Sequence, residues 1–422
     1  MANSYTINFA ATNNNLGDYN ITFVTDPGSP EAFSATLNGN SLSDSYSFTP
    51  TTDDVVVISS VGWTGNMYVS TLAFNADTPV YTTDTTNSFQ CIEFSGTDTF
   101  TKPDVTYMNW YSIPIQIENT TTQVSYGVPT ENFSQAGILN QLESLTSSTK
   151  TTVINDVNGN FLRIIGPNAN VPYISTYPSF QSYLEYCFEK DWNNYGLFVN
   201  LQNLYDGVQN PTHVWKMRQT YDNYNSNYNG GMVFYDTENS ELTITGKTIF
   251  INPDNDQPTG ATSTYTIQAN NLSMDQMNTN IYLSQFAYTW SMVYTDPQGN
   301  NHNYAKLSAD IADNDVFAAI VRDFLAGFAF GFIRSKTIDA ATGNQYGADS
   351  SQDWQNCDGL TLFDDLQPIA ITSPYYYYNS WANVIYQNFS NVYSFAFTDF
   401  IPAINPQLLV NTGDTLLVTI LN

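Results

Sequence analysis

The sequence predicts an α+β, β-rich fold with two domains. Three observations support this prediction: short alternating runs fill the first part of the chain, amphipathic helical stripes occur only in its middle, and an alternating run closes it. We therefore expect a β-sandwich or barrel domain over residues 1–130, completed by about 392–422, and a mixed α/β domain over 131–391. The two domains are expected to abut across a broad groove.

The predicted strands of the first domain are separated by clusters of Asn, Gly, Pro and Asp, which favour turns. These strands are SYTINFAAT (4–12), YNITFVT (19–25), SYSFTP (45–50), DVVVIS (54–59) and MYVSTLAF (67–74). Their short length and even spacing are typical of a sandwich or barrel.

Helical spacing of apolar residues predicts four helices, over residues 135–146, 179–195, 311–332 and 380–388. Further strands are expected around these helices. They are FLRIIG (161–166), GMVFYD (231–236), SELTITGKTIFINP (240–253), FAYTWSMVYTDPQGN (286–300), NVYSFAFTDF (391–400) and DTLLVTIL (414–421).

The charge balance restricts the class of partner. The chain has 11 basic and 39 acidic residues and a formal net charge of −28. Nucleic acid and anionic membranes are poor partners for it, because binding to phosphate requires Lys and Arg. A neutral polymer such as a glycan or a divalent cation fits better; alternatively, the charge only keeps the protein soluble.

The sequence predicts no metal site, no cofactor and no membrane insertion. Its three cysteines, Cys91, Cys187 and Cys357, have no zinc spacing, and no phosphate-binding loop is present. The N-terminus lacks the pattern of a signal peptide. The apolar run 316–333 contains Arg322 and Asp323 at its centre, so we expect it to be a buried helix of a soluble domain.

Two stretches carry candidate site residues. DVTYMNWYSIPIQIE (104–118) alternates with period two, so Asn109 shares one face with apolar and aromatic neighbours. SPYYYYNSW (373–381) concentrates aromatic side chains, including Tyr377, Tyr378 and Trp381. Such rings either stack on the faces of sugars or pack beneath neighbouring loops.

Several motifs resemble those of a known family. CIEF (91–94) followed by DVTYMNWYSIPI (104–115) is similar to the pattern "EF … D-x-S-x-V-D-x-x-x-x-P" of thaumatin-like proteins and of the β-1,3-glucanases in glycoside hydrolase family 64. Later segments resemble glucanase motifs in the same order over roughly residues 90–420. They are FLRIIGPN, FQSYLEYCFEKDWNNY, AAIVRDFLAGFAFGFIRSKT, NSWANVIY and YSFAFTDF.

The resemblance implies a thaumatin-like domain and a β-glucan-like polysaccharide as partner. It also implies a catalytic pair of carboxylates, and the matching positions are Glu93 and Asn109. An amide cannot accept a proton near neutral pH, so this chain departs from the family at the second position. Asp104 or Glu118 could substitute for the missing carboxylate.

Other polar positions differ as well. The family's Tyr-Asp-Asp becomes Phe397, Thr398 and Asp399, and its His becomes Tyr386. The full set expected to bind substrate by this resemblance and by the aromatic stretch is Asp104, Tyr107, Tyr377, Tyr378, Trp381, Tyr386, Thr398 and Asp399.

The sequence therefore supports three hypotheses of function. The first is a non-catalytic or weakened relative of the glucanases that binds a β-glucan-like polysaccharide or serves as a structural protein. The second is an active endo-β-1,3-glucanase. The third is an extracellular or particle-coat structural protein that assembles with copies of itself. By the same resemblance we expect the protein outside the cell or at its surface.

Overall fold

The computed structural model describes residues 4–74 except 14, 80–146 except 131–132, 152–187 except 170, 379–395 and 406–421. Between these ranges it describes 209–210, 213–214, 216–219, 232–236, 241–251, 258–283, 290–295, 299, 301–306, 325 and 328–329. The chain forms two compact units, Met1–Pro178 with Ser380–Asn422, and Ser179–Asn379. The division made from sequence, at residues 130 and 391, differs from this one.

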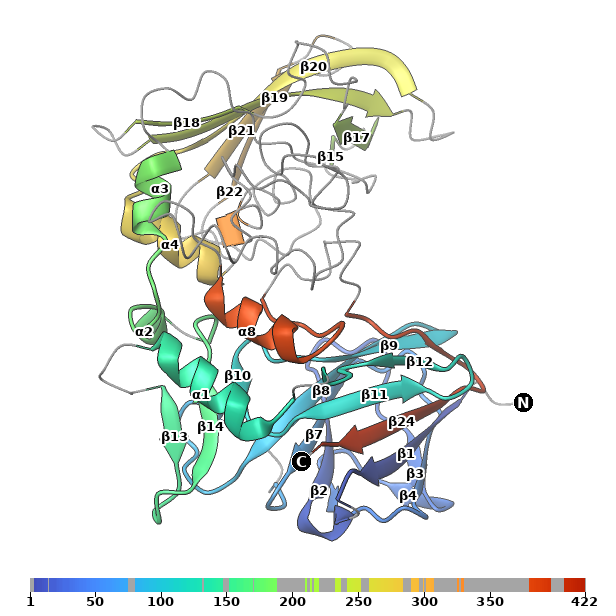
Figure 1. Ribbon diagram of the computed structural model, residues 1–422. Coiled ribbons are helices and arrows are strands. Elements are labelled where there is room, and N and C mark those ends of the chain that lie inside the picture. Colours follow the sequence, from blue (N-terminus) through green and yellow to red (C-terminus); the bar gives the residue numbers. More distant parts are fainter. Residues whose placement is uncertain are drawn as a thin grey trace. The chain divides into compact units, whose positions relative to one another are not determined.

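Two sheets build most of the first unit (Figure 1). A seven-stranded sheet has the order β12-β11-β24-β1-β6-β3-β4. Its strands are β1 (Tyr5–Ala11), β3 (Ala35–Leu37), β4 (Asn40–Leu42), β6 (Val55–Ile58), β11 (Ile115–Asn119), β12 (Val124–Tyr126) and β24 (Thr415–Ile420).

The second sheet has six strands in the order β23-β9-β8-β7-β2-β5. They are β2 (Asn20–Thr25), β5 (Ser47–Phe48), β7 (Gly65–Ser70), β8 (Phe89–Gly96), β9 (Phe100–Val105) and β23 (Val410–Asn411). All five strand runs expected before residue 75 are present, and the predicted β-rich fold class is confirmed.

The core of the sandwich lies between these sheets. Along β1, alternation turns Tyr5, Ile7 and Phe9 inward, and all three are buried. The ring of Tyr5 stacks on Phe94 of β8 with centroids 6.5 Å apart, and Phe9 meets Phe48 of β5 at 6.0 Å. Aromatic pairs of this kind stabilise a fold beyond the apolar area that they bury.

The C-terminal strand β24 lies in the middle of the seven-stranded sheet. It pairs in parallel with β1 and antiparallel with β11. The turn before β24 is fixed by Asp414, whose Oδ2 accepts hydrogen bonds from Asn119 Nδ2 at 2.8 Å and from the backbone N–H of Asn411 at 2.9 Å. The last strand is therefore needed to connect β1 with β11.

Among the described residues of the first unit, a small sheet and four short helices accompany the sandwich. The sheet has the order β10-β14-β13, formed by Trp110–Tyr111, Phe161–Ile165 and Val153–Asn155. The helices are η1 (Leu16–Asp18), α1 (Gln135–Leu145), α2 (Val171–Ile174) and α8 (Ser380–Asn388). The predictions of helices over 135–146 and 380–388 are confirmed.

The second unit contains a further six-stranded sheet. Its strand order is β17 (Lys216–Gln219), β19 (Glu241–Ile251), β20 (Pro258–Ala269), β21 (Trp290–Thr295) and β22 (Asn301–Lys306). The remaining strand, β18 (Met232–Asp236), pairs with β19. A separate two-stranded pair is formed by β15 (Gln209–Asn210) and β16 (His213–Val214). Helices α3 (Gln181–Cys187) and α4 (Met274–Leu283) pack together, with the rings of Phe180 and Tyr282 at 4.9 Å.

Six predicted elements fall partly outside the described residues. Of the strands expected over 231–236, 240–253 and 286–300, the structure describes β18, β19, and β21 with residue 299. Of the helix expected over 179–195, the structure describes α3; of the helix over 311–332, it describes residues 325, 328 and 329. Of the strand expected over 391–400, residues 391–395 are described, and there Tyr393 forms an isolated parallel bridge with Thr106.

Candidate functional site

A row of polar side chains crosses three neighbouring strands of the six-stranded sheet. Asn66 on β7 lies directly opposite Glu93 on β8, and Glu93 lies directly opposite Asp104 on β9. Side chains at directly opposed positions share one face of the sheet and lie within contact range of each other. The fold therefore brings Glu93 and Asp104 together as a carboxyl pair.

The local sequence explains why Glu93 faces away from the sandwich. Its neighbours Ile92 and Phe94 are buried in the core, with Phe94 packed against Tyr5 of the opposite sheet. Because successive side chains on a strand point to opposite faces, Glu93 lies on the outer face, where it is exposed. Asp104 is buried, at 3% exposure.

A third carboxylate joins the row at the end of β2. Asp26 accepts a hydrogen bond from Asn66 Nδ2 at 3.1 Å. Asn66 thus lies between Asp26 and Glu93, and its amide bonds one of the two carboxylates directly. This arrangement concentrates negative charge on one side of the sheet.

The surroundings of Glu93 raise its pKa to about 7. The larger cause is the protein that surrounds the carboxyl group and displaces water, and the second is repulsion from Asp26. The side chain still reaches solvent, so it can exchange a proton with a bound molecule. The pKa of Asp26 is raised too, by burial, although its hydrogen bond to Asn66 opposes the shift.

The outer face near Glu93 is covered on one side by an apolar cluster. Its buried members are Tyr68, Phe89, Cys91, Trp110 and Ile165. The indole N–H of Trp110 donates to the carbonyl of Phe89 at 2.9 Å and holds the cover in place. Burial raises the pKa of the Cys91 thiol well above its usual value, and Glu93 and Asp104 raise it further.

Buried Arg163 fixes the loop beside this cluster. Its guanidinium donates to the carbonyls of Tyr81, Asp84 and Asn87, with distances of 2.5 Å to Tyr81 and 2.7 Å to Asn87. The same group lies over the ring of Phe89, 4.5 Å from its centroid. Tyr81 in turn stacks on Trp110 at 4.6 Å, so the loop and the cover act as one packed element.

The alternating run in the middle of 104–118 does not form one strand. β9 ends at Val105, Asn109 lies in a bend, and the chain continues as β10 and then β11. Asn109 is half-buried, and its carbonyl accepts a hydrogen bond from the N–H of Gly166 at 2.8 Å. No strand pairing aligns Asn109 with Glu93, whereas pairing does align Asp104.

Three residues expected to bind substrate belong to the core. Tyr107 is completely buried, and its hydroxyl accepts from the N–H of Ile115 at 2.8 Å. The indole N–H of buried Trp381 donates to the carbonyl of Tyr107 at 2.8 Å, and Tyr386 is buried at 2% exposure. Because these side chains have no open surface, they support the fold and do not form a binding surface.

Tyr377, Tyr378, Thr398 and Asp399 lie outside the described residues. Glu118 is described, but it belongs to the seven-stranded sheet, where it pairs with Ser125 and Leu417. Sequence reasoning missed Asp26 and Asn66, because nothing in their local patterns indicates that β2 and β7 come to lie beside Glu93.

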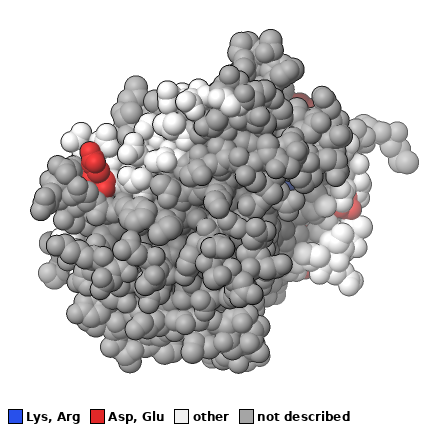
Figure 2. Space-filling model, turned by 90° about the horizontal axis from the view of Figure 1, so that it is seen from above, with Lys and Arg blue, Asp and Glu red and all other residues white. Residues whose placement is uncertain are grey.

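In the described part of the chain, no group of three or more His, Cys, Asp or Glu side chains has a geometry suited to a metal ion. Within the same residues, no helix combines the length and the apolar character needed to cross a membrane. The face drawn in Figure 2 carries mostly uncharged side chains where it is described, with scattered acidic ones.

The solved structures that resemble this chain include two β-1,3-glucanases. One is a laminaripentaose-producing β-1,3-glucanase in complex with laminaritetraose, at 14% identity and a TM-score of 0.49, covering 99% of this chain and 97% of that one. The other is a β-1,3-glucanase domain of glycoside hydrolase family 64 from Clostridium beijerinckii, at 11% identity and a TM-score of 0.46, covering 100% and 99%. Both are β-1,3-glucanases, the class whose motifs the sequence resembles.

No family model matches the chain. No curated protein matches it in sequence.

Proposed function

We propose that the protein is glucanase-like and binds a β-glucan-like polysaccharide at the outer face of the six-stranded sheet, with hydrolysis weak or absent. The observation that carries this proposal is Glu93, an exposed carboxyl group with a pKa of about 7, aligned with Asn66 and Asp104 across three strands. Carboxyl and amide groups bond sugar hydroxyls, and the excess of acidic residues disfavours polyanions.

Glycoside hydrolysis requires two carboxyl groups that reach the sugar, one protonated and one ionised. Glu93 is about half protonated at pH 7, so it suits the role of the acid. Asp104 is buried, and the residue at position 109 is an amide. The second role is therefore poorly filled, which supports binding with little turnover.

The pairing of Glu93 with Asp104 favours one alternative, an active endo-β-1,3-glucanase in which Asp104 substitutes for the missing carboxylate. A local opening of the sheet at β9 would have to expose Asp104 to the substrate. Reducing-sugar release from laminarin by the purified protein separates the two functions. Rapid release that disappears in both Glu93→Gln and Asp104→Asn would establish the enzyme.

Binding is tested by sedimentation with an insoluble β-1,3-glucan. We expect the protein to be retained, and Glu93→Ala to weaken retention by about tenfold, because a hydrogen bond to a charged group contributes about 1.5–3 kcal/mol. Glu118→Ala removes a carboxylate from the other sheet and should leave retention unchanged. Absence of retention in the parent protein would contradict the proposal.

A restoring substitution tests the place of Asn109. Asn109→Asp supplies a carboxylate of nearly the same volume at a half-buried position. If position 109 retains access to the substrate, we expect weak laminarin cleavage that is lost in the double variant Glu93→Gln/Asn109→Asp. If Asn109→Asp is folded but shows no cleavage, the bend has removed this position from the site.

A further inference from the structure

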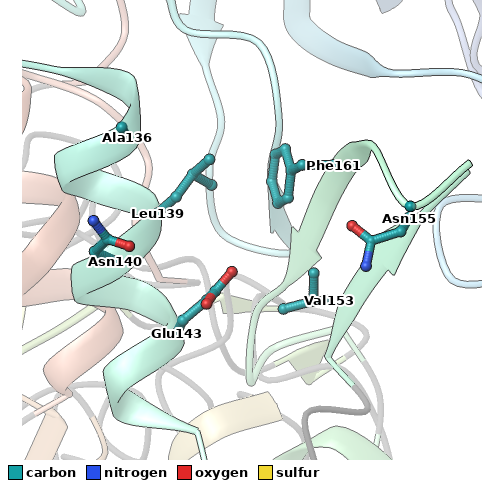
Figure 3. Close-up of a pocket in the computed structure, with 8 residues that line it drawn as sticks. Ala136, Leu139, Asn140, Glu143, Val153, Asn155 and Phe161 are labelled. Atoms are coloured by element: carbon teal, nitrogen blue, oxygen red, sulfur yellow. The ribbon is translucent and has the colours of Figure 1, made fainter.

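A second concave site lies on the first unit, between α1 and the β13–β14 hairpin. It is an open pocket of about 400 Å³ (Figure 3). Its lining residues are Ala136, Leu139, Asn140, Glu143, Val153, Asn155, Gly159 and Phe161. None of them belongs to the row around Glu93, so the pocket is a separate feature of the molecule.

The helix contributes one regular stripe to this pocket. Ala136, Leu139, Asn140 and Glu143 follow the i, i+3, i+4, i+7 spacing that places side chains on one helical face. The core stripe of α1 is a different one, formed by buried Ile138 and Leu142. The side chains that line the pocket are therefore not the ones that anchor α1 to the core. Leu139, which is one of them, is half-exposed.

The hairpin contributes the opposite wall. Asn155 on β13 lies directly opposite Phe161 on β14, so their side chains share a face, and Val153 precedes Asn155 by two positions. In Figure 3, Leu139 and Glu143 extend from the helix toward Phe161, Val153 and Asn155 of the hairpin. Phe161 and Val153 are both half-exposed, although a packed core would bury them.

Local hydrogen bonds hold both walls in place. The side chain of Ser134 caps α1 by accepting from the N–H of Gly137 at 3.0 Å. In the hairpin turn, Asp156 accepts from the N–H groups of Asn158 and Asn160, each at 2.8 Å, and from Asn160 Nδ2 at 2.8 Å. Gly159 adopts the positive φ of 84° that the turn requires. A preformed pocket loses less entropy when a ligand binds.

The chemistry of the lining selects the class of ligand. Leu139, Val153 and Phe161 provide an apolar floor, and Asn140, Asn155 and Glu143 provide donors and acceptors around it. A sugar ring matches this combination, because it has apolar C–H faces and hydroxyl groups at its edge. No basic side chain lines the pocket, which disfavours anions, and a simple cation would use Glu143 alone.

We propose that this pocket is a carbohydrate subsite that holds part of a neutral glycan, separate from Glu93. The volume of about 400 Å³ falls in the lower part of the range for small-molecule sites, about 300–1,000 Å³. The subsite would give a polymer a second point of attachment on the same protein, and two linked weak contacts bind a chain more tightly than either alone.

The test is a titration of the full protein with laminaritetraose, followed by NMR of isotope-labelled methyl groups. We expect saturable shifts of the Leu139 and Val153 methyl resonances. In Glu143→Ala/Asn155→Ala, the affinity measured from these shifts should fall by about tenfold or more, because two hydrogen bonds are removed. The matched control is Glu118→Ala/Asn40→Ala, which makes the same chemical changes on the seven-stranded sheet and should titrate like the parent.

The subsite and the Glu93 site can fail independently. Glu93→Ala should leave the methyl shifts intact even where it abolishes retention on insoluble glucan. The subsite is overturned if millimolar tetrasaccharide leaves both resonances unmoved, or if the pocket variant titrates like the parent. It is also overturned if spermidine shifts these methyl groups and the tetrasaccharide does not, since the pocket would then select cations.

Discussion

At the scale of single residues, Glu93 is distinguished by its neighbours. An isolated exposed glutamate titrates near 4.5, and this one titrates near 7 because protein crowds the carboxyl group and Asp26 adds repulsion. Asn66 links the two carboxylates, because it donates a hydrogen bond to Asp26 and lies directly opposite Glu93. The property belongs to a group of residues drawn from three strands.

Removing the charge of Asp26 should lower the pKa of Glu93. The substitution Asp26→Asn keeps the shape of the side chain and removes the repulsion, so the pKa should move from about 7 part of the way toward 4.5. An NMR titration of the Glu93 carboxyl carbon measures this directly. Asp54→Asn, a change at a half-buried carboxylate elsewhere in the first unit, is the control, and an equal shift in both variants would show that only net charge matters.

Glu93 should also impose a pH dependence on stability. Its pKa is about 7 in the folded state and about 4.5 when unfolded, so the folded protein binds the proton more tightly. Stability from this group is thus fully present below pH 4.5 and is lost as the pH rises to about 7 and above. We expect Glu93→Gln to be more stable than the parent at pH 8, with the difference decreasing toward pH 4.5.

Thermal unfolding at several pH values measures this difference. Glu118→Gln, on the seven-stranded sheet, should show no such trend. A stability gain in Glu93→Gln that stays constant from pH 4.5 to pH 8 would mean that packing, and not ionisation, causes it.

At the scale of elements, the segment between β9 and β11 shows where periodicity fails. Its alternating aromatic residues predict one strand, but the chain bends at residues 108–109. Buried Gln90 holds this irregular path, because it donates to the carbonyl of Thr106 at 2.6 Å and accepts from the N–H of Ser112 at 3.1 Å. The bend separates Asn109 from the regular pairing that connects Glu93 with Asp104.

Arg163 holds the loop at residues 81–87 in place, as Gln90 holds the bend. Arg163→Met fills a similar volume but leaves the carbonyls of Tyr81, Asp84 and Asn87 without their buried donor. We expect the free energy of unfolding of the first unit to fall by about 2–4 kcal/mol, since charged hydrogen bonds are lost from the interior. Hydrogen exchange should become faster in peptides that cover this loop.

Lys102→Met is the control for loss of a cation, because Lys102 is half-buried. It should change stability by less than about 1 kcal/mol. If Arg163→Met unfolds at the same temperature as Lys102→Met, and the loop exchanges no faster, then Arg163 does not hold the loop.

At the scale of the whole molecule, the second unit is an insertion into the first. The chain leaves the first unit after Pro178 and returns at Ser380. The two ends lie close together within that unit, because the rings of Tyr177 and Trp381 meet at right angles with centroids 5.9 Å apart. The final strand β24 then completes the seven-stranded sheet between β1 and β11.

This connection predicts that the first unit folds alone. A chain with residues 179–379 replaced by a short Gly/Ser linker should be soluble, rich in β-structure and cooperative in unfolding, because every strand of the sandwich is retained. Circular dichroism and thermal unfolding measure this. A second variant, in which residues 412–422 are also removed from this shortened chain, should give the opposite result. It deletes β24 and should prevent folding; a soluble, cooperative product would show that β1 and β11 do not need it.

The sequence by itself determined the β-rich class, the early strands, and helices α1 and α8, because periodicity and turn residues act locally. Through the family resemblance it also pointed to Glu93, with Asp104 as an alternative partner, and their role at a binding site stays a prediction. Only the tertiary structure decided which groups surround Glu93. Alternation fixes the face on which a side chain lies, but pairing between strands distant in the chain fixes its neighbours. For this reason Asp26 and Asn66 joined the site, while Tyr107, Trp381 and Tyr386 became part of the core.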